Sequence, residues 1–250
     1  KKIIIKKNSS IYEAMNIGIK NANGDFIGVL NSDDIYQNCK VINDVCKEIK
    51  KNPISKIFIG NLVYFKDKDF YNVKRYFNSI NFKAWMLRFG IMPPHPSTFI
   101  SKKIYKENGY YNPNLKIASD FEFFFRIIYL RKIKFIIINR TLVRMRLGGV
   151  SGLGLSSFFK INNEIRSAFK DSNINLSYLS TLFRLPSKIK QIFFINNMKL
   201  NKNFIKPDFY FEKEFKFIDN FNLIDNVNKI PFNKNFVLSA MNLAYLGSFA

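Results

Sequence analysis

A short apolar run that ends in two adjacent carboxylates constrains this chain more than any other feature. The stretch GDFIGVLNSDD begins with mostly small and apolar residues and ends in Asp33 and Asp34. Its first half is typical of a buried strand, which we predict over Asp25–Leu30. Open α/β sheets bind ligands at the carboxyl ends of their strands, and Asn31, Asp33 and Asp34 offer the hard oxygen atoms that Mg²⁺ or Mn²⁺ prefers. An Asx turn or a helix N-cap would use the same residue types, so both interpretations stay open here.

Helical periodicity flanks this strand on both sides. Ser10 and Glu13 have the spacing of a capping box before apolar residues that recur every three or four positions, and Gly24 ends that helix. A second predicted helix covers 41–49, and a further strand covers 56–65. This alternation of strands and helices predicts an α/β domain with a mostly parallel sheet.

The following part of the chain reads as a loop, helices and strands. Ser119 and Glu122 have the spacing of a second capping box, which predicts a helix through about Arg131. The remaining predicted elements are a proline-rich loop and strand over 89–101, a short helix over 101–108, and two separate strands over 134–138 and 142–146.

The chain is strongly basic. Its 250 residues include 40 Lys and Arg against 18 Asp and Glu, a formal net charge of +22. Such a surface attracts polyanions, phosphorylated substrates or anionic lipid, although lysines that are merely solvated would explain the charge equally well. The two cysteines form no disulfide or zinc pattern, which suits a reducing cytosol. No signal peptide is evident, and no apolar run approaches the roughly 18 residues of a membrane span.

Residues 10–36, SIYEAMNIGIKNANGDFIGVLNSDDIY, closely resemble the family 2 glycosyltransferases with a GT-A fold. That family carries a helix of the type GIYDAMNKGI and then A-x-G-x-x-I-x-x-LNSDD-x-Y. The resemblance implies an α/β fold of GT-A-like (Rossmann-like) type, with a mixed sheet flanked by helices. It also implies that Asp33, supported by Asp34, holds a Mg²⁺ or Mn²⁺ ion on the diphosphate of a nucleotide-sugar donor. Asn31 stands at the motif position where many relatives have Asp.

The same resemblance assigns roles to polar residues on two helices. Tyr12 and Asn16 lie on the helix that packs beside the nucleotide-sugar site, and it places them at the substrate. The segment KIASDFEFFFRI is similar to the family's ED-x-D-x-x-x-R, whose second acidic residue, here Asp120, is the catalytic base. By position, Glu122 then belongs to the substrate site and Arg126 to the donor site. An acidic residue in a first helical turn also has a purely structural reading, since the helix dipole favours its ionised form by about 0.3–1 kcal/mol.

Two loops complete the set of candidate site residues. His95, the only histidine, lies in MPPHPSTF, which is similar to a PH-x-(S/A)-T-F segment on the acceptor side of the family's cleft and implies substrate contact. MRLGGVSG matches the family's closing GG-x-S loop. The amides of Gly148 and Gly149, together with Arg144 or Arg146, would hold phosphate there.

The resemblance covers about residues 2–152 and starts within the family's fold. The family's first strand, helix and second strand, with a D-x-S-x-D segment, have no counterpart here. We therefore predict an N-terminally truncated glycosyltransferase domain over 1–152 and a basic, mainly helical appendage over 153–231. The segment FVLSAMNLAYLGSF in 232–250 resembles the start of an N-acetylmannosaminuronic-acid transferase family domain.

The function implied by the resemblance is inverting, metal-assisted hexosyl transfer. The donor is a nucleotide-diphosphate sugar and the acceptor is a glycan or a lipid-linked glycan in bacterial surface polysaccharide synthesis. The implied location is the cytoplasm. The basic and aromatic residues 155–235 permit two interpretations, docking on the anionic inner face of the cell membrane or a helical appendage packed on the catalytic domain, and both stay open here. One alternative is a basic nucleic-acid-binding protein, which the charge and the 28 Phe residues permit, although no nucleic-acid module motif is present. The other is an inactive glycosyltransferase fragment.

Overall fold

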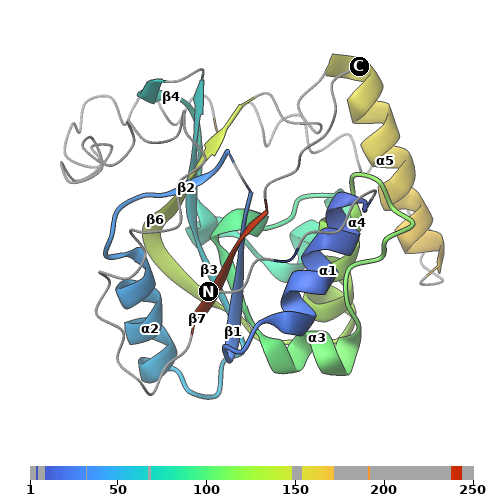
Figure 1. Ribbon diagram of the computed structural model, residues 1–250. Coiled ribbons are helices and arrows are strands. Elements are labelled where there is room, and N and C mark those ends of the chain that lie inside the picture. The colour runs from blue at the N-terminus through green and yellow to red at the C-terminus, as the bar shows by residue number, and fades with distance from the viewer. Residues whose placement is uncertain are drawn as a thin grey trace.

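A single mixed sheet with helices on both faces forms the fold of this computed structural model (Figure 1). The structure describes residues 4, 9–31, 33–66, 69–147, 154–171, 191 and 238–243. Its helices are α1 (Ile11–Asn21), α2 (Val41–Lys51), α3 (Lys102–Asn108), α4 (Ser119–Phe124) with a π-helical continuation (Phe125–Leu130), and α5 (Gly154–Asp171). Short 3-10 turns occupy Ser79–Asn81, Ala84–Phe89 and His95–Ser97. The expected α/β class with a mixed, helix-flanked sheet is confirmed.

The strands run in both directions. They are β1 (Phe26–Asn31), β2 (Ile35–Tyr36), β3 (Ile57–Lys66), β4 (Asp69–Phe77), β5 (Thr98–Ser101), β6 (Ile136–Arg146) and β7 (Leu238–Leu243). The order is β2-β6-β3-β5-β1-β7, with β4 paired to β3. Only β3–β6 and β1–β7 are parallel among the described pairings, and the other four are antiparallel. The prediction of a mostly parallel sheet was therefore wrong, because β5 lies between β3 and β1 and opposes both.

The apolar run before the acidic pair is a strand buried on both faces. Ile27 and Val29 pack in the cluster that contains α1, α4 and α5, while Phe26 and Leu30 pack in the cluster that contains α2. Successive side chains of a strand point to opposite faces, so a strand covered on both sides is apolar throughout. Gly28 completes the run because a Cβ there would lie 2.6 Å from the Phe99 ring on β5.

The first predicted helix forms as expected. The Ser10 hydroxyl accepts from the Glu13 N–H at 3.2 Å, and the Glu13 carboxylate accepts from the Ser10 N–H at 2.8 Å, which completes the capping box. Tyr12, Met15 and Ile19 form the buried face of α1. Through this face, α1 packs against the sheet beside β1.

Two local predictions were wrong. Ala118 is the N-cap of α4, so Ser119 is already helical and makes no capping hydrogen bond. The predicted capping box therefore does not form, and Glu122 pairs with Arg126 instead. The two strands predicted around residues 134–146 are one strand, β6, whose register against β3 shifts on either side of Asn61. A shift of this kind absorbs an irregular stretch without ending the strand.

β7 comes from the far end of the chain and pairs with the whole of β1. The register runs from Phe26 opposite Leu238 to Asn31 opposite Leu243. A segment predicted to begin a second transferase domain thus lies beside the strand that ends in the acidic motif (Figure 1). The predicted domain boundaries stay predictions, and apart from α5 and two short pieces the residues beyond 153 lie outside the described part of the chain. None of the helices in the described ranges combines the length and apolarity needed to cross a membrane.

Candidate active site

A tight turn at the end of β1 brings the acidic motif together. The Asp34 N–H donates to the Asn31 carbonyl at 3.1 Å, and Asn31 Nδ2 donates to Asp34 Oδ2 at 2.8 Å. Asp33 is exposed, whereas Asp34 is 3% exposed. The turn thus presents one carboxylate to solvent and holds the other under the surface.

The electrostatics of this turn are unfavourable for two carboxylates alone. Burial, followed by the charge of Asp33, raises the pKa of Asp34 to about 7, while hydrogen bonds from Asn31 and from the Arg146 backbone oppose the rise. Asn31 Oδ1 and Asp34 Oδ1 are buried and have no hydrogen-bond partner in the described part of the chain. A cation would satisfy both oxygens and offset the repulsion between the acids.

The donor set of this turn fits a hard divalent cation. Two carboxylates and one amide oxygen leave coordination positions for substrate phosphate, which is how Mg²⁺ commonly binds in proteins. The described residues contain no group of three His, Cys, Asp or Glu side chains arranged to hold a metal on their own. The turn is therefore suited to a cation whose remaining coordination positions a phosphorylated ligand fills.

Asp120 lies in the first turn of α4 and is held by α1. Its Oδ1 accepts from the Phe121 N–H at 2.8 Å and lies 3.2 Å from the Tyr12 hydroxyl. The same hydroxyl donates to the Ile117 carbonyl at 2.5 Å. Burial, and then the charge of Asp120, raises the pKa of Tyr12 well above its ordinary value, so this hydroxyl keeps its proton. The Asp120 carboxylate is thus oriented by its own helix and by a residue from α1.

A second carboxylate, from α5, holds the turn that precedes α4. Glu164 accepts from the backbone N–H groups of Lys116 at 3.2 Å, Ile117 at 2.8 Å and Ala118 at 2.8 Å. Hydrogen bonds to an ionised acceptor are among the stronger ones in proteins. Sequence reasoning did not find Glu164, because nothing local distinguishes it from any other polar residue of an amphipathic helix.

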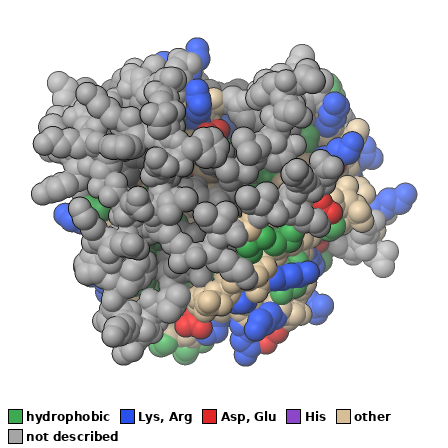
Figure 2. Space-filling view, in the orientation of Figure 1, with side chains coloured by type: hydrophobic (Ala, Val, Ile, Leu, Met, Phe, Trp, Pro, Cys, Tyr) green, Lys and Arg blue, Asp and Glu red, His purple; other side chains and the backbone are tan. Residues whose placement is uncertain are grey.

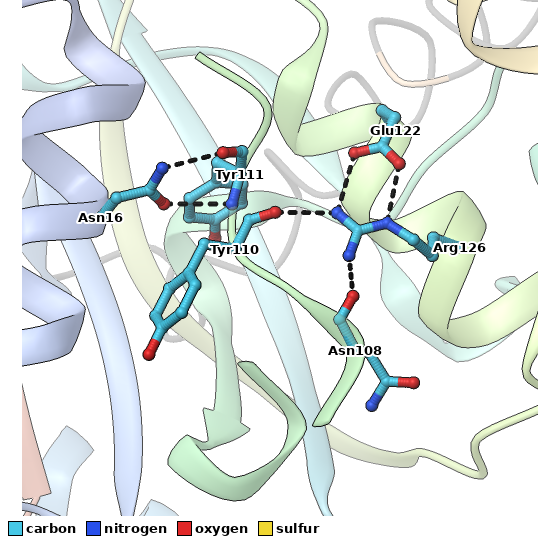
Figure 3. A network of polar contacts seen from close by, with 6 residues as sticks. All are labelled: Asn16, Asn108, Tyr110, Tyr111, Glu122 and Arg126. Carbon is cyan, nitrogen blue, oxygen red and sulfur yellow. Dashed lines mark hydrogen bonds and ion pairs between the residues drawn. The ribbon is translucent and has the colours of Figure 1, made fainter. Parts of the chain in front are cut away.

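Asn16 connects α1 to the loop before α4 (Figure 3). Its Nδ2 donates to the Tyr111 carbonyl at 2.8 Å, and its Oδ1 accepts from the Tyr111 N–H at 3.0 Å. Both polar atoms of the Asn16 amide therefore hydrogen-bond to the backbone of one residue, Tyr111. The predicted substrate contacts of Asn16 and Tyr12 stay predictions, and the contacts that the structure shows are to the protein.

Glu122 and Arg126 form an ion pair on one face of α4 and its continuation (Figure 3). Arg126 Nε and Nη2 donate to the two carboxylate oxygens at 2.7 and 2.9 Å. Nη2 also donates to the Tyr110 carbonyl at 2.8 Å, and Nη1 donates to the Asn108 carbonyl. The guanidinium thereby ties the loop after α3 to the helix that carries Asp120. The donor and substrate roles of this pair remain predictions.

His95 is buried next to the same loop. Its Nε2 lies 2.7 Å from the Tyr111 hydroxyl, which lies 3.2 Å from the Tyr105 hydroxyl. Burial lowers the pKa of His95 to about 4, so the imidazole is neutral at ordinary pH. Its predicted contact with substrate is not tested by this geometry.

The basic end of β6 lies next to the acidic turn. β2, which follows Asp34 directly, pairs with β6 so that Ile35 stands opposite Arg144. Arg146 ends β6 with an exposed side chain, and its backbone opposes the rise in the pKa of Asp34. Gly148 and Gly149 lie outside the described residues. The structure thus brings Asn31, Asp34 and Arg146 together, and it brings Tyr12 to Asp120.

Comparison with protein families identifies the class. The sequence model of glycosyl transferase family 2 matches residues 1–133, which include the acidic turn, the Tyr12–Asp120 contact and the Glu122–Arg126 pair. This match covers more than half of the chain. The chain therefore belongs to glycosyl transferase family 2.

Solved structures of S. aureus TarS resemble this fold at low sequence identity. TarS 1-349 in complex with UDP has a TM-score of 0.42 and 14% identity, and the match covers 69% of this chain and 48% of that chain. TarS 1-349 has a TM-score of 0.43 and 14% identity, and the match covers 71% of this chain and 50% of that chain. The longer TarS has the same TM-score and identity, and the match covers 71% of this chain and 30% of that chain. This chain thus spans half or less of those chains. A comparison with curated protein sequences found no match.

Proposed function

We propose that this protein transfers a sugar from a nucleotide-diphosphate sugar to a hydroxyl group of a glycan or lipid-linked acceptor, with inversion at the anomeric carbon. The observation that carries the proposal is the orientation of Asp120 in a family 2 chain. Its carboxylate stands at the start of α4, fixed by the Phe121 N–H and adjacent to the protonated hydroxyl of Tyr12. A positioned carboxylate of this kind is a suitable general base.

In the proposed step, Asp120 accepts the proton of the acceptor hydroxyl. The acceptor oxygen forms a bond to the anomeric carbon while the bond from that carbon to the diphosphate oxygen breaks on the opposite face. The nucleotide diphosphate leaves with the electron pair of the broken bond, and the configuration at the anomeric carbon inverts. The Tyr12 hydroxyl, shared with the Ile117 carbonyl, keeps Asp120 in one orientation throughout.

Asn31, Asp33 and Asp34 are the residues that would hold Mg²⁺ or Mn²⁺. When bound, such a cation supplies electrostatic stabilisation of the charge that develops on the departing diphosphate. The two buried oxygens without partners and the raised pKa of Asp34 support this assignment. Arg146 adds a positive charge at the same edge of the sheet, where it would contact phosphate.

The cellular setting is also a proposal. We place the protein in the cytoplasm, at the inner face of a bacterial cell membrane, in the synthesis of surface polysaccharide. Its support is the net charge of +22, which favours anionic membrane lipid. Figure 2 shows Lys and Arg side chains interspersed with Asp and Glu on the described part of the protein surface that is in view.

Turnover of nucleotide sugars tests the proposal. The full chain would be incubated with Mn²⁺ and a panel of UDP-, GDP- and dTDP-sugars, and release of the nucleotide diphosphate would be followed with and without EDTA. The proposal predicts metal-dependent release from at least one donor. No release from any donor, together with no binding of UDP and Mn²⁺ by calorimetry, would favour the inactive fragment. A salt-sensitive shift of a labelled oligonucleotide in place of turnover would favour a nucleic-acid-binding protein.

A further inference from the structure

We propose that Glu164 is a positioning residue for Asp120, so that α5 is part of the machinery that sets the catalytic carboxylate in place. The inference rests on the proposed function, in which Asp120 is the general base. It adds a residue that lies outside the matched range of 1–133 and outside every motif of the sequence.

The peptide unit between Ile117 and Ala118 is held from two helices. Its N–H donates to Glu164 Oε2 at 2.8 Å, and its carbonyl accepts from the Tyr12 hydroxyl at 2.5 Å. Because both polar ends are held from different helices, the plane of this unit is fixed two residues before Asp120. The hydroxyl that fixes the carbonyl is also the one that lies 3.2 Å from Asp120 Oδ1.

Glu164 reaches this turn because α5 is anchored by packing. Ile161, Ile165 and Phe169 recur every four residues along α5 and are all buried, at 6%, 1% and 1% exposure. The Phe169 ring packs edge-on against Phe125 with centroids 4.2 Å apart, and against Phe121 at 5.7 Å. Phe121 directly follows Asp120 in α4. The same helix therefore contacts the catalytic segment before and after the carboxylate.

The charge of Glu164 is suited to this position. Its carboxylate accepts three N–H groups from the turn that precedes α4, and hydrogen bonds to an ionised acceptor are among the stronger ones in proteins. A glutamine of the same shape would offer one acceptor oxygen and one NH₂ group, and the NH₂ group cannot accept from an N–H. Glu164→Gln is thus nearly isosteric, but its single acceptor oxygen cannot serve both the Lys116 N–H and the two N–H groups that share Oε2.

The consequence for the reaction is specific. Loosening the turn would displace Asp120 while leaving the acidic turn at the end of β1 untouched. Misplacement of a reacting group by about 1 Å can cost a factor of roughly 100 in rate. For Glu164→Gln we expect kcat to fall by about 10- to 100-fold, with the KM for the nucleotide sugar unchanged within about twofold.

The experiment combines hydrogen exchange with kinetics on the full chain. The variants are Glu164→Gln and the matched control Asn163→Ala, whose side chain is exposed at the adjacent position of α5. Exchange of the backbone amides of residues 116–122 would be followed by mass spectrometry, and release of UDP from UDP-glucose and UDP-N-acetylglucosamine would be measured with Mn²⁺. Far-ultraviolet circular dichroism would establish the folded fraction of each variant, so that a general loss of folding is separated from a local effect.

The proposal predicts faster exchange of these amides and a lower kcat in Glu164→Gln only, with the folded fraction retained. Unchanged exchange in Glu164→Gln would overturn the contact itself. Faster exchange with unchanged kcat, or a rate loss that merely follows the folded fraction, would overturn the positioning role. Wild-type protein without turnover on any nucleotide sugar would overturn the proposed function, while the exchange measurement would still decide whether Glu164 holds the segment.

Discussion

The Tyr12 hydroxyl of α1 lies 3.2 Å from Oδ1 of Asp120, although 108 positions separate the two residues along the chain. The contact joins the motif of the first helix to the motif of the predicted catalytic base. It gives Tyr12 a defined role within the protein, as the residue that orients Asp120 and ties the Ile117 carbonyl to α1.

Replacing Tyr12 with Phe removes this hydroxyl and keeps the ring. We expect the free energy of unfolding to fall by about 1–2 kcal/mol, because the Ile117 carbonyl loses its donor in a partly buried site. Turnover should fall as well, while binding of UDP and Mn²⁺ is retained. Urea unfolding, turnover and calorimetry measure the three quantities. Tyr110→Phe is the control, since the Tyr110 hydroxyl makes no hydrogen bond that the structure describes; equal losses in both variants would contradict the assignment.

Arg126 should matter to stability more than its ion-pair partner. Arg126→Gln removes the pair with Glu122 and also the donors to two backbone carbonyls, so we expect a loss of about 2–3 kcal/mol. Glu122→Gln leaves those backbone contacts in place and should cost about 1 kcal/mol or less. Lys103→Gln, which breaks an exposed pair with Glu107, should stay within about 0.5 kcal/mol. Chemical unfolding ranks the three variants, and a larger loss in Glu122→Gln than in Arg126→Gln would contradict the hydrogen-bond network of Arg126.

Asp34 should lower the stability of the protein without ligands and contribute to the binding of metal and UDP. Asp34→Asn removes a buried charge beside Asp33, so without metal the variant should be more stable than the wild type by about 1–3 kcal/mol at pH 8. The same change should abolish the stabilisation that Mn²⁺ and UDP give the wild type. Thermal unfolding with and without both ligands checks the two effects. A variant that is destabilised without metal, or that keeps the full ligand response, would argue for a purely structural turn.

His95 should make stability depend on pH in a definite direction. Burial lowers the pKa of His95 in the folded protein to about 4, against an ordinary value of 6.5. The unfolded chain therefore binds a proton at His95 that the folded protein does not, between those two values. The free energy of unfolding is therefore unaffected by titration of His95 above pH 6.5 and falls as the pH drops from 6.5 toward 4. The expected decrease is about 2 kcal/mol between pH 7.5 and pH 5.

Because the chain has one histidine, the test is direct. The imidazole signals in a pH titration by nuclear magnetic resonance belong to His95 alone and should show no transition above pH 5. The difference in unfolding free energy between wild type and His95→Gln should shrink as the pH is lowered, since contributions of other groups cancel in that difference. A midpoint near 6.5 would mean that the ring is solvated and hydrogen-bonded differently.

The sequence was a reliable guide where short-range chemistry decides the structure. The capping box of Ser10 and Glu13 and the apolar faces of α1 and α2 formed as predicted, and the strand predicted over Asp25–Leu30 formed one residue later, as Phe26–Asn31. Each depends on residues within a few positions of one another. The acidic turn also formed locally, with Asn31 and Asp34 bonded to each other.

Predictions failed where residues distant in the sequence determine the local structure. Ser119 and Glu122 had the spacing of a capping box, but Glu164 and Arg126 provide stronger charged partners for the turn and for Glu122. No local pattern reveals that a carboxylate of α5 reaches that turn. The direction of β5 and the pairing of β7 with β1 likewise depend on how the chain returns to the sheet, which periodicity does not encode. The predicted contacts of His95 and Arg146 with ligands stay predictions.

Turnover by an Asp120→Asn variant tests the central claim most directly. Asparagine keeps the shape of the side chain and accepts from the Phe121 N–H, but it cannot take a proton from the acceptor hydroxyl. We predict that metal-dependent transfer falls to background, while calorimetry shows wild-type binding of UDP with Mn²⁺. Transfer at the wild-type rate by Asp120→Asn would contradict the assignment of Asp120 as the base.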